Sequence, residues 1–177
     1  MLKLARTNAE AHLYMAQQPC GCGALGFAGG HLNSAVIVAH GDLATRYTGR
    51  CAGCGAMRCF EFRLPEEPLA PPRRGVQFGG AEPSRLLDPG EWMAIADDHA
   101  MRVPASGGTA EGERANAVAL AAIGEVLKFF PAGAEACPPE AFTSARGRAI
   151  YAAEPGRFRR VRLEAVRDTY AALGAQN

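Results

Sequence analysis

Six cysteines are the residues of this chain best suited to chemistry, and four of them fall in two close pairs. Cys20 and Cys22 are separated by one residue, Cys51 and Cys54 by two, and a glycine follows each pair. Paired cysteines at such short spacing are typical of metal sites in proteins that are not exported. The first 18 residues contain no apolar segment of the kind that a secretory signal needs. We therefore expect a cytoplasmic protein with metal-binding thiols.

The spacing of these pairs predicts one structural zinc site with four thiolate ligands, Cys20, Cys22, Cys51 and Cys54. Two residues between Cys51 and Cys54 let both sulfurs reach one ion, and Gly55 permits a left-handed turn that directs backbone N–H groups at the sulfurs. A structural zinc takes such ligands in a tetrahedron. Over residues 18–64 the chain resembles the zinc-ribbon group, which implies a Zn²⁺ ion that acts as a scaffold and two knuckles joined by a β-hairpin.

The first cysteine pair departs from the zinc-ribbon pattern, because C-x-C is one residue shorter than the usual C-x-x-C. Cys20 is therefore the ligand whose place another residue could take. The candidates within reach are His31, His40 and Cys59. Cys137 stands alone before two prolines, and we expect it to be a small buried apolar side chain.

A catalytic role for the expected zinc ion is not favoured. Catalytic zinc keeps one position open for water, whereas four thiolates close the coordination shell. Deaminase-type sites combine a C-x-x-C knuckle with His-x-Glu, and none of the four histidines has a glutamate two residues later. The cluster Asp97–His99 is more simply explained as the end of a helix. We therefore expect a protein that is not an enzyme, with a zinc-dependent hydrolase as the least favoured alternative.

A second group of residues with chemical potential is basic and lies near the C-terminus. Exposed arginines on the last predicted helix could contact phosphate groups of a nucleic acid; they are Arg159, Arg160, Arg162 and Arg167. The net charge is only +1, and the preference for arginine over lysine fits GC-rich coding. A solvated helix face with partial ion pairing, such as Glu164 with Arg160, is therefore the favoured interpretation.

Three β-strands are predicted around the second cysteine pair. The runs Ala35–Val38 and Leu43–Tyr47 flank a polar turn at 40–42, and Met57–Leu64 alternates between apolar and polar residues. A short helix over residues 7–18, with a Thr-x-x-Glu capping box at its start, precedes them. The first two of these strands, on either side of the turn at 40–42, are expected to form the hairpin that a zinc ribbon requires.

The remainder of the chain is predicted to be helical after a linker, residues 65–81, that is rich in proline and glycine. Asp88 begins one helix, with Pro89 in the first position. Further helices are expected over 115–130 and 144–153. The last helix is expected to present one apolar face made of Phe158, Val161, Ala165, Thr169 and Leu173, with Val166 and Tyr170 beside it.

The expected fold is α+β: residues 1–64 hold the first helix and a small three-stranded antiparallel zinc ribbon, which packs against a mostly helical portion, residues 82–177. No apolar run reaches the ~20 residues that span a bilayer, so no membrane partner is expected. With a fully ligated zinc ion, the expected function is a non-enzymatic protein-binding component, namely an adaptor or an inhibitor or immunity-type partner of another protein. The alternative is a nucleic-acid-binding zinc-ribbon protein that uses its arginine-rich last helix.

Overall fold

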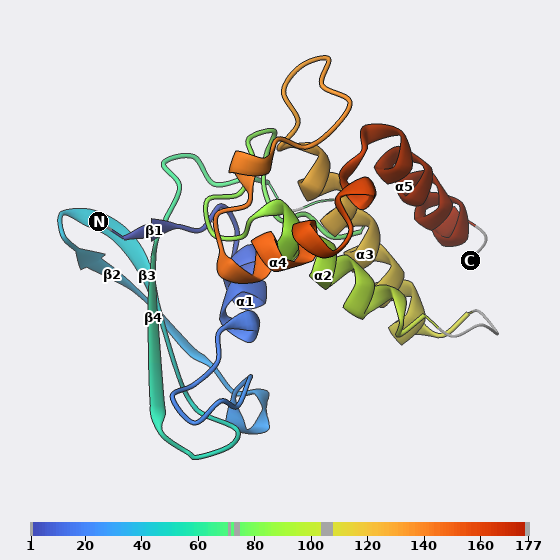
Figure 1. Cartoon of the computed structure of the whole chain (residues 1–177). Helices are drawn as coiled ribbons and strands as arrows, with labels where there is room; N and C mark the ends of the chain where they lie inside the picture. The colour runs from blue at the N-terminus through green and yellow to red at the C-terminus, as the bar shows by residue number, and fades with distance from the viewer. Residues whose placement is uncertain (1, 71, 73–74, 104–107, 176–177) are drawn as a thin grey trace. The chain divides into compact units, whose positions relative to one another are not determined.

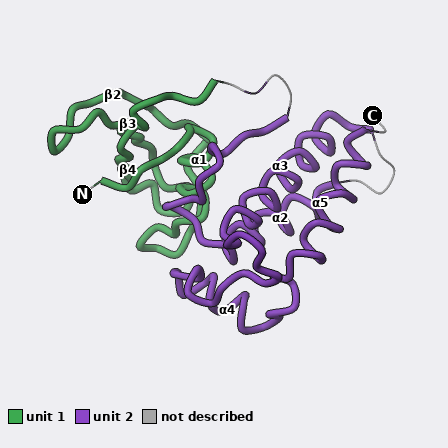
Figure 2. Tube along the Cα trace, turned by 90° about the horizontal axis from the view of Figure 1, so that it is seen from above, with its two compact units in different colours: residues 1–70 green, residues 71–177 purple. Residues whose placement is uncertain are grey.

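Two compact units make up the chain. The computed structural model describes residues 2–70, 72, 75–103 and 108–175, which divide into unit 1, residues 1–70, and unit 2, residues 71–177 (Figure 2). The class is mixed α+β, as predicted, and every described strand of the sheet belongs to unit 1. Among the described residues, no helix combines the length and the apolar character that crossing a membrane requires.

The sheet of unit 1 has four strands in the order β1-β4-β3-β2 (Figure 1). The antiparallel neighbours β2 (Asn33–Ala39), β3 (Asp42–Arg50) and β4 (Met57–Arg63) correspond to the three predicted strands. The predicted three-stranded antiparallel ribbon is nevertheless incomplete, because β1 (Lys3–Leu4) pairs in parallel with β4. A strand of two residues is too short to show an alternating pattern, so the sequence carried no signal for it.

A tight two-residue turn joins β2 to β3. Ala39 pairs with Asp42, and between them His40 and Gly41 have φ angles of 54° and 87°. Two successive positive φ angles are typical of the turn whose twist matches a β-hairpin. The turn therefore fixes the register of β2 on β3.

Helix α1 (Asn8–Gln17) packs on one face of the sheet. It begins at Thr7, whose hydroxyl accepts a 3.1 Å hydrogen bond from the backbone N–H of Glu10. Edge-to-face ring contacts join His12 to Tyr47 and Tyr14 to Phe62, at 5.3 and 5.7 Å between centroids. These contacts place aromatic side chains of α1 against β3 and β4.

Unit 2 consists of the helices α2 (Pro89–Ala100), α3 (Ala110–Leu127), α4 (Ala145–Ala153) and α5 (Arg160–Ala175), drawn in Figure 1 from green to red. Asp88 caps α2 through a 3.0 Å bond from the N–H of Glu91 and also accepts a 2.7 Å bond from the N–H of Ser144, the N-cap of α4. One buried carboxylate thus joins the starts of two helices. The largest fully buried side chains of this unit include Trp92, Phe158, Leu87, Ile95, Ile123 and Leu163.

The described part of the predicted linker, residues 65–81, contains no helix or strand, and the boundary between the units falls within it. Residues 71, 73 and 74 of this segment lie outside the described residues. Its later part is not a bare connector, because Phe78 is buried with its ring 5.1 Å from that of Trp92. The core of unit 2 therefore begins before residue 81.

The prediction of one apolar face on the last helix holds for Phe158, which is buried, but is wrong for Val161, Ala165, Thr169 and Leu173, which are exposed. Val161 is 74% exposed, whereas Leu163 is buried and Val166 and Tyr170 are half-buried. Phe158 precedes the helix and lies in an aromatic cluster with Phe142, at 4.8 Å between centroids. This anchor and the 3-10 turn Pro155–Phe158 set the rotation with which α5 begins. The stripe of smaller apolar residues consequently faces away from the core of unit 2: Val161, Ala165 and Leu173 are all exposed.

Candidate metal centre

Four cysteines from two separate loops gather at one end of the sheet in unit 1. The sulfurs of Cys20, Cys22, Cys51 and Cys54 all lie within 4.8 Å of one another. Cys20 Sγ is 3.8 Å from Cys54 Sγ, and Cys22 Sγ is 3.7 Å from Cys51 Sγ. Sulfurs placed tetrahedrally about 2.3 Å from a zinc ion are separated by about 3.8 Å. The cluster therefore has dimensions that could hold a metal ion.

The second knuckle, which contains Cys51 and Cys54, lies in the turn between β3 and β4. Cys51 directly follows β3, and its N–H donates a 2.8 Å hydrogen bond to the carbonyl of Ala56. The N–H of Gly55 donates back to the carbonyl of Cys51 at 3.0 Å, with Gly55 at a φ of 72°. A positive φ costs glycine little, which explains the glycine after the second cysteine.

The first knuckle is closed in a similar way despite its shorter spacing. The N–H of Cys20 donates to the carbonyl of Ala24, and the N–H of Gly23 donates to the carbonyl of Cys20, both at 2.8 Å. Gly23 has a φ of 85°, so it takes the same left-handed role as Gly55. A C-x-C pair therefore brings both of its sulfurs to the cluster without distorting the second knuckle.

The two knuckles touch where Gly53 faces Ala24. A Cβ atom built on Gly53 would lie 2.6 Å from the Cβ of Ala24 and 3.5 Å from the sulfur of Cys22. Only a residue without a side chain fits there, because real carbon atoms do not approach so closely. Gly53 also donates its N–H to the sulfur of Cys51 at 3.4 Å. The absence of a Cβ at this position lets the first loop close over the second.

Arg58 on β4 holds the first knuckle against the sheet, a contact that the sequence did not predict. Its guanidinium donates to the carbonyl of Gln18 at 2.7 Å and to that of Gly26 at 3.1 Å, on either side of the Cys20–Cys22 pair. The side chain is only 8% exposed and lies against the rings of Phe27 and Phe60, at 4.8 and 5.1 Å from their centroids. Backbone carbonyls as acceptors leave no trace in the sequence, so no pattern marked this arginine.

The environment of the sulfurs favours a thiolate at Cys51. Hydrogen bonds from the backbone N–H groups of Cys54 and Gly53 lower the pKa of Cys51 to about 6. The N–H of Ala56 also lowers the pKa of Cys54, but the neighbouring sulfurs of Cys22, Cys51 and Cys20 outweigh it and raise that pKa to about 11. A divalent ion bound by these sulfurs would favour the thiolate form of its ligands.

The substitute ligands considered for Cys20 do not lie in this cluster. Among the described residues, the group of suitable ligand atoms consists of the four cysteines, without His31, His40 or Cys59. His40 occupies the β2–β3 turn, and Cys59 pairs with Thr48 in the interior of β4, where it is exposed.

A tetrahedral set of four sulfurs is typical of zinc or iron.

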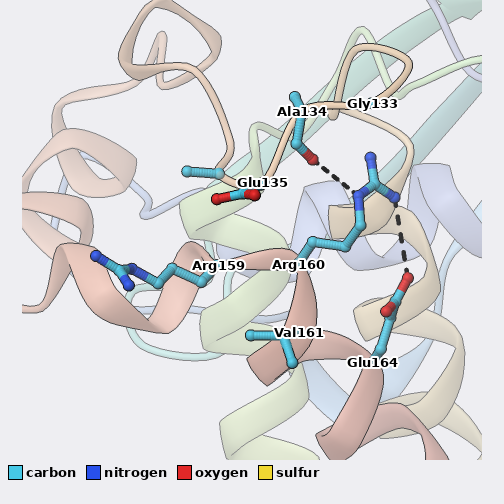
Figure 3. A pocket seen from close by; sticks show the side chains of 8 residues that line it. Gly133, Ala134, Glu135, Arg159, Arg160, Val161 and Glu164 are labelled. Atoms are coloured by element: carbon cyan, nitrogen blue, oxygen red, sulfur yellow. Dashed lines mark hydrogen bonds and ion pairs between the residues drawn. The ribbon is translucent and has the colours of Figure 1, made fainter.

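The arginines of the second predicted site are mostly engaged within unit 2. Arg160 donates to the carbonyl of Ala134 at 2.8 Å and approaches Glu164 at 4.0 Å, and Figure 3 shows it between these two groups. Arg162 pairs with Glu154 at 2.8 Å, and Arg167 pairs with Asp168 at 2.9 Å.

A cavity of about 530 Å³ lies beside this group and is lined by Ala134, Glu135, Arg159, Arg160, Val161 and Glu164. In Figure 3, the side chain of Arg159 points away from that of Arg160. The two glutamates offset the two arginines, so the lining is not a concentrated basic surface.

No protein-family model, no curated protein and no solved structure matches this chain. The resemblance to zinc ribbons accordingly remains a likeness of the cysteine arrangement in residues 18–64.

Proposed function

We propose that the chain is a non-enzymatic protein-binding component whose first unit is stabilised by a structural zinc ion. The observation that carries this proposal is the cluster of four sulfurs, which all lie within 4.8 Å of one another. Four thiolates fill the coordination shell of zinc and leave no position for a water molecule or a substrate. This argues for a scaffold and against the zinc-dependent hydrolase.

A structural ion would connect two segments of unit 1 that are distant along the chain. The first knuckle lies in an irregular segment between α1 and β2, while the second belongs to a hairpin. One ion bound to both would join a loop to the sheet. Zinc binding supplies about 10 kcal/mol or more in comparable small peptides, enough to decide whether so small a unit folds.

The exposed face of α5 supports protein binding. Val161 is 74% exposed and Leu173 is 42% exposed, with Ala165 between them on the same side of the helix. Apolar residues at this spacing form a stripe of the kind that a partner protein can cover. Arg162, on the same side of the helix as the stripe, already pairs with Glu154, which favours a protein surface over a phosphate backbone.

The protein-binding proposal is tested by affinity capture with the tagged full-length chain. Val161→Asp places a charge on the α5 stripe, and Ala171→Asp places the same charge at an exposed position on another side of the helix. A partner captured by the wild type and by Ala171→Asp, but lost with Val161→Asp, would support the proposal. Equal capture by both variants would contradict a role for this face.

The nucleic-acid alternative has its own signature. Binding through the arginines would weaken steeply as salt rises, and it would weaken further in Arg159→Glu. Retention of DNA or RNA with this salt dependence would replace the protein-binding proposal. Failure to retain either nucleic acid at low salt would remove the alternative.

A further inference from the structure

The outer edge of β2 carries backbone groups that no described segment of the chain pairs with. In the strand order β1-β4-β3-β2, this strand is the last, and it bonds to β3 alone. It is also long for an edge strand, spanning Asn33–Ala39 without a proline. An open edge is a template for one kind of ligand, another β-strand, because only a strand matches its row of N–H and C=O groups.

The register shows which residues face this edge. The carbonyl of Leu43 accepts a 2.9 Å hydrogen bond from the N–H of Leu64, on the β4 side of β3. Because the backbone groups of Leu43 point toward β4, they form no hydrogen bonds with Val38, the residue opposite on β2. By the alternation of an antiparallel ladder, the backbone groups of Val38, Val36 and Ser34 point outward.

The side chains at the edge are apolar and exposed. Val36 and Val38 are 67% and 75% exposed, and Leu43, which lies opposite Val38 on the same face, is 60% exposed. No residue of β2 carries a charge. Natural edge strands usually bear charges, prolines or bulges that prevent pairing with another chain, and this strand bears no such device.

We propose that two copies of this chain associate through β2, pairing antiparallel about a two-fold axis at Val36. This register sets Val36 opposite Val36 of the second copy and Ser34 opposite Val38 of the second copy. All three residues direct their backbone groups outward, so each opposed pair exchanges two hydrogen bonds. The result is one continuous sheet across both copies.

Charge favours a copy of this chain as the occupant. The strand is neutral over its whole length, so self-pairing brings no like charges together, and a charged partner strand would find no opposite charge to pair with. The valines of both copies would form one apolar strip that removes their exposed area from water. This inference depends neither on the metal ion nor on the protein-binding role of α5.

Sedimentation equilibrium of the zinc-loaded full-length chain, from about 1 to 200 µM, tests the proposal. The wild type, with a monomer mass of 18.6 kDa, is expected to approach twice this mass as its concentration rises. Val36→Lys and Val36→Glu each place like charges opposite one another across the axis and are expected to remain monomers. Val36→Thr keeps a neutral β-branched residue and should still associate.

The decisive sample is an equimolar mixture of the two charged variants, Val36→Lys and Val36→Glu. Only an axis at residue 36 places the two new side chains opposite each other, so the mixture is expected to form a heterodimer at low salt. Its recovery would also exclude misfolding as the reason that each variant alone is monomeric. A wild type that stays monomeric at 200 µM would overturn the proposal and leave the edge to a strand of another protein. Dimers formed by either charged variant alone, or a mixture that stays monomeric, would overturn it equally.

Discussion

Arg58 on β4 donates a 2.7 Å hydrogen bond to the backbone carbonyl of Gln18, two residues before Cys20. A second bond from the same guanidinium, to the carbonyl of Gly26, holds the other end of the loop. The first knuckle is thus positioned by a buried side chain that is not itself a metal ligand. Groups of this kind orient metal ligands and affect affinity without touching the ion.

Replacement of Arg58 is expected to weaken metal binding. Arg58→Ala removes both hydrogen bonds and should lower zinc affinity roughly 10- to 100-fold, as measured by competition with a chromophoric chelator. Arg46→Ala is the matched control, because Arg46 lies in the same sheet but forms an exposed ion pair with Glu61 at 2.8 Å, which is worth little. Equal affinities for Arg58→Ala and the wild type would show that the loop needs no such support.

Contact between the knuckles predicts a specific steric effect at Gly53. Gly53→Ala should weaken zinc binding, because the new Cβ would lie 2.6 Å from that of Ala24. The double variant Gly53→Ala/Ala24→Gly removes the clashing atom and should recover most of the affinity, which a double-mutant cycle with chelator competition would measure. Gly21→Ala is a suitable control, since a Cβ at Gly21 would meet nothing within 4 Å. If the changes in zinc-binding free energy caused by Gly53→Ala and Ala24→Gly were simply additive in the double variant, this would be evidence against the contact.

Thiol reactivity should distinguish three classes of cysteine. In the zinc-loaded protein, Cys59 is exposed and outside the cluster, so it should react quickly with a thiol reagent. Removal of zinc should make the four cysteines of the cluster reactive as well, because their sulfurs are then no longer bound to the metal. Cys137 should react only after unfolding, since burial above all, with Asp88 and Glu140 nearby, raises its pKa to about 12. Fast reaction of the cluster thiols without release of zinc would contradict this assignment. Cys59→Ser is the control, because this variant should lose the fast reaction of the zinc-loaded protein.

Acid is expected to destabilise unit 2 partly through His99. Burial, aided by the positive charge of Arg102 and opposed by Asp98, lowers the pKa of His99. Between the lowered folded-state pKa of His99 and about pH 6.5, the unfolded chain therefore binds more protons than the folded chain. The stabilisation by neutral His99 is fully present above that pH and is lost as the pH falls through the lower folded-state pKa.

The variant His99→Gln should therefore lose less stability than the wild type between about pH 7.5 and pH 5. Urea unfolding followed by the fluorescence of Trp92, the single tryptophan, reports on unit 2. The contribution of the metal site is common to both proteins and cancels in the comparison. Parallel stability curves for the two proteins would contradict the prediction.

Local patterns predicted most of the elements. Alternation in Met57–Leu64 and the capping residues Thr7 and Asp88 marked a strand and two helix starts that the structure contains. The rotation of α5 could not be predicted in the same way. Its apolar residues form two adjacent stripes, and the choice between them depends on the anchoring of Phe158 in an aromatic cluster with residues distant along the chain. Periodicity describes a helix, whereas that contact belongs to the tertiary fold.

For the candidate site, spacing predicted which cysteines would come together but not what holds them there. The pairs Cys20–Cys22 and Cys51–Cys54 are visible as short intervals in the sequence. Arg58 acts through the carbonyl of Gln18, and any residue could supply that carbonyl, so the sequence held no signature of the contact. The close approach of Gly53 to Ala24 was hidden for a similar reason, since it joins residues that are far apart in the chain.

Metal content tests most directly whether the four cysteines hold a zinc ion. Elemental analysis for zinc and iron should find one zinc per chain in the wild type and in Cys59→Ser, and a large loss in Cys54→Ser. The two variants each remove one exposed thiol, but only Cys54 belongs to the cluster. Wild-type protein purified without stoichiometric zinc, or with iron in its place, would contradict the structural zinc site.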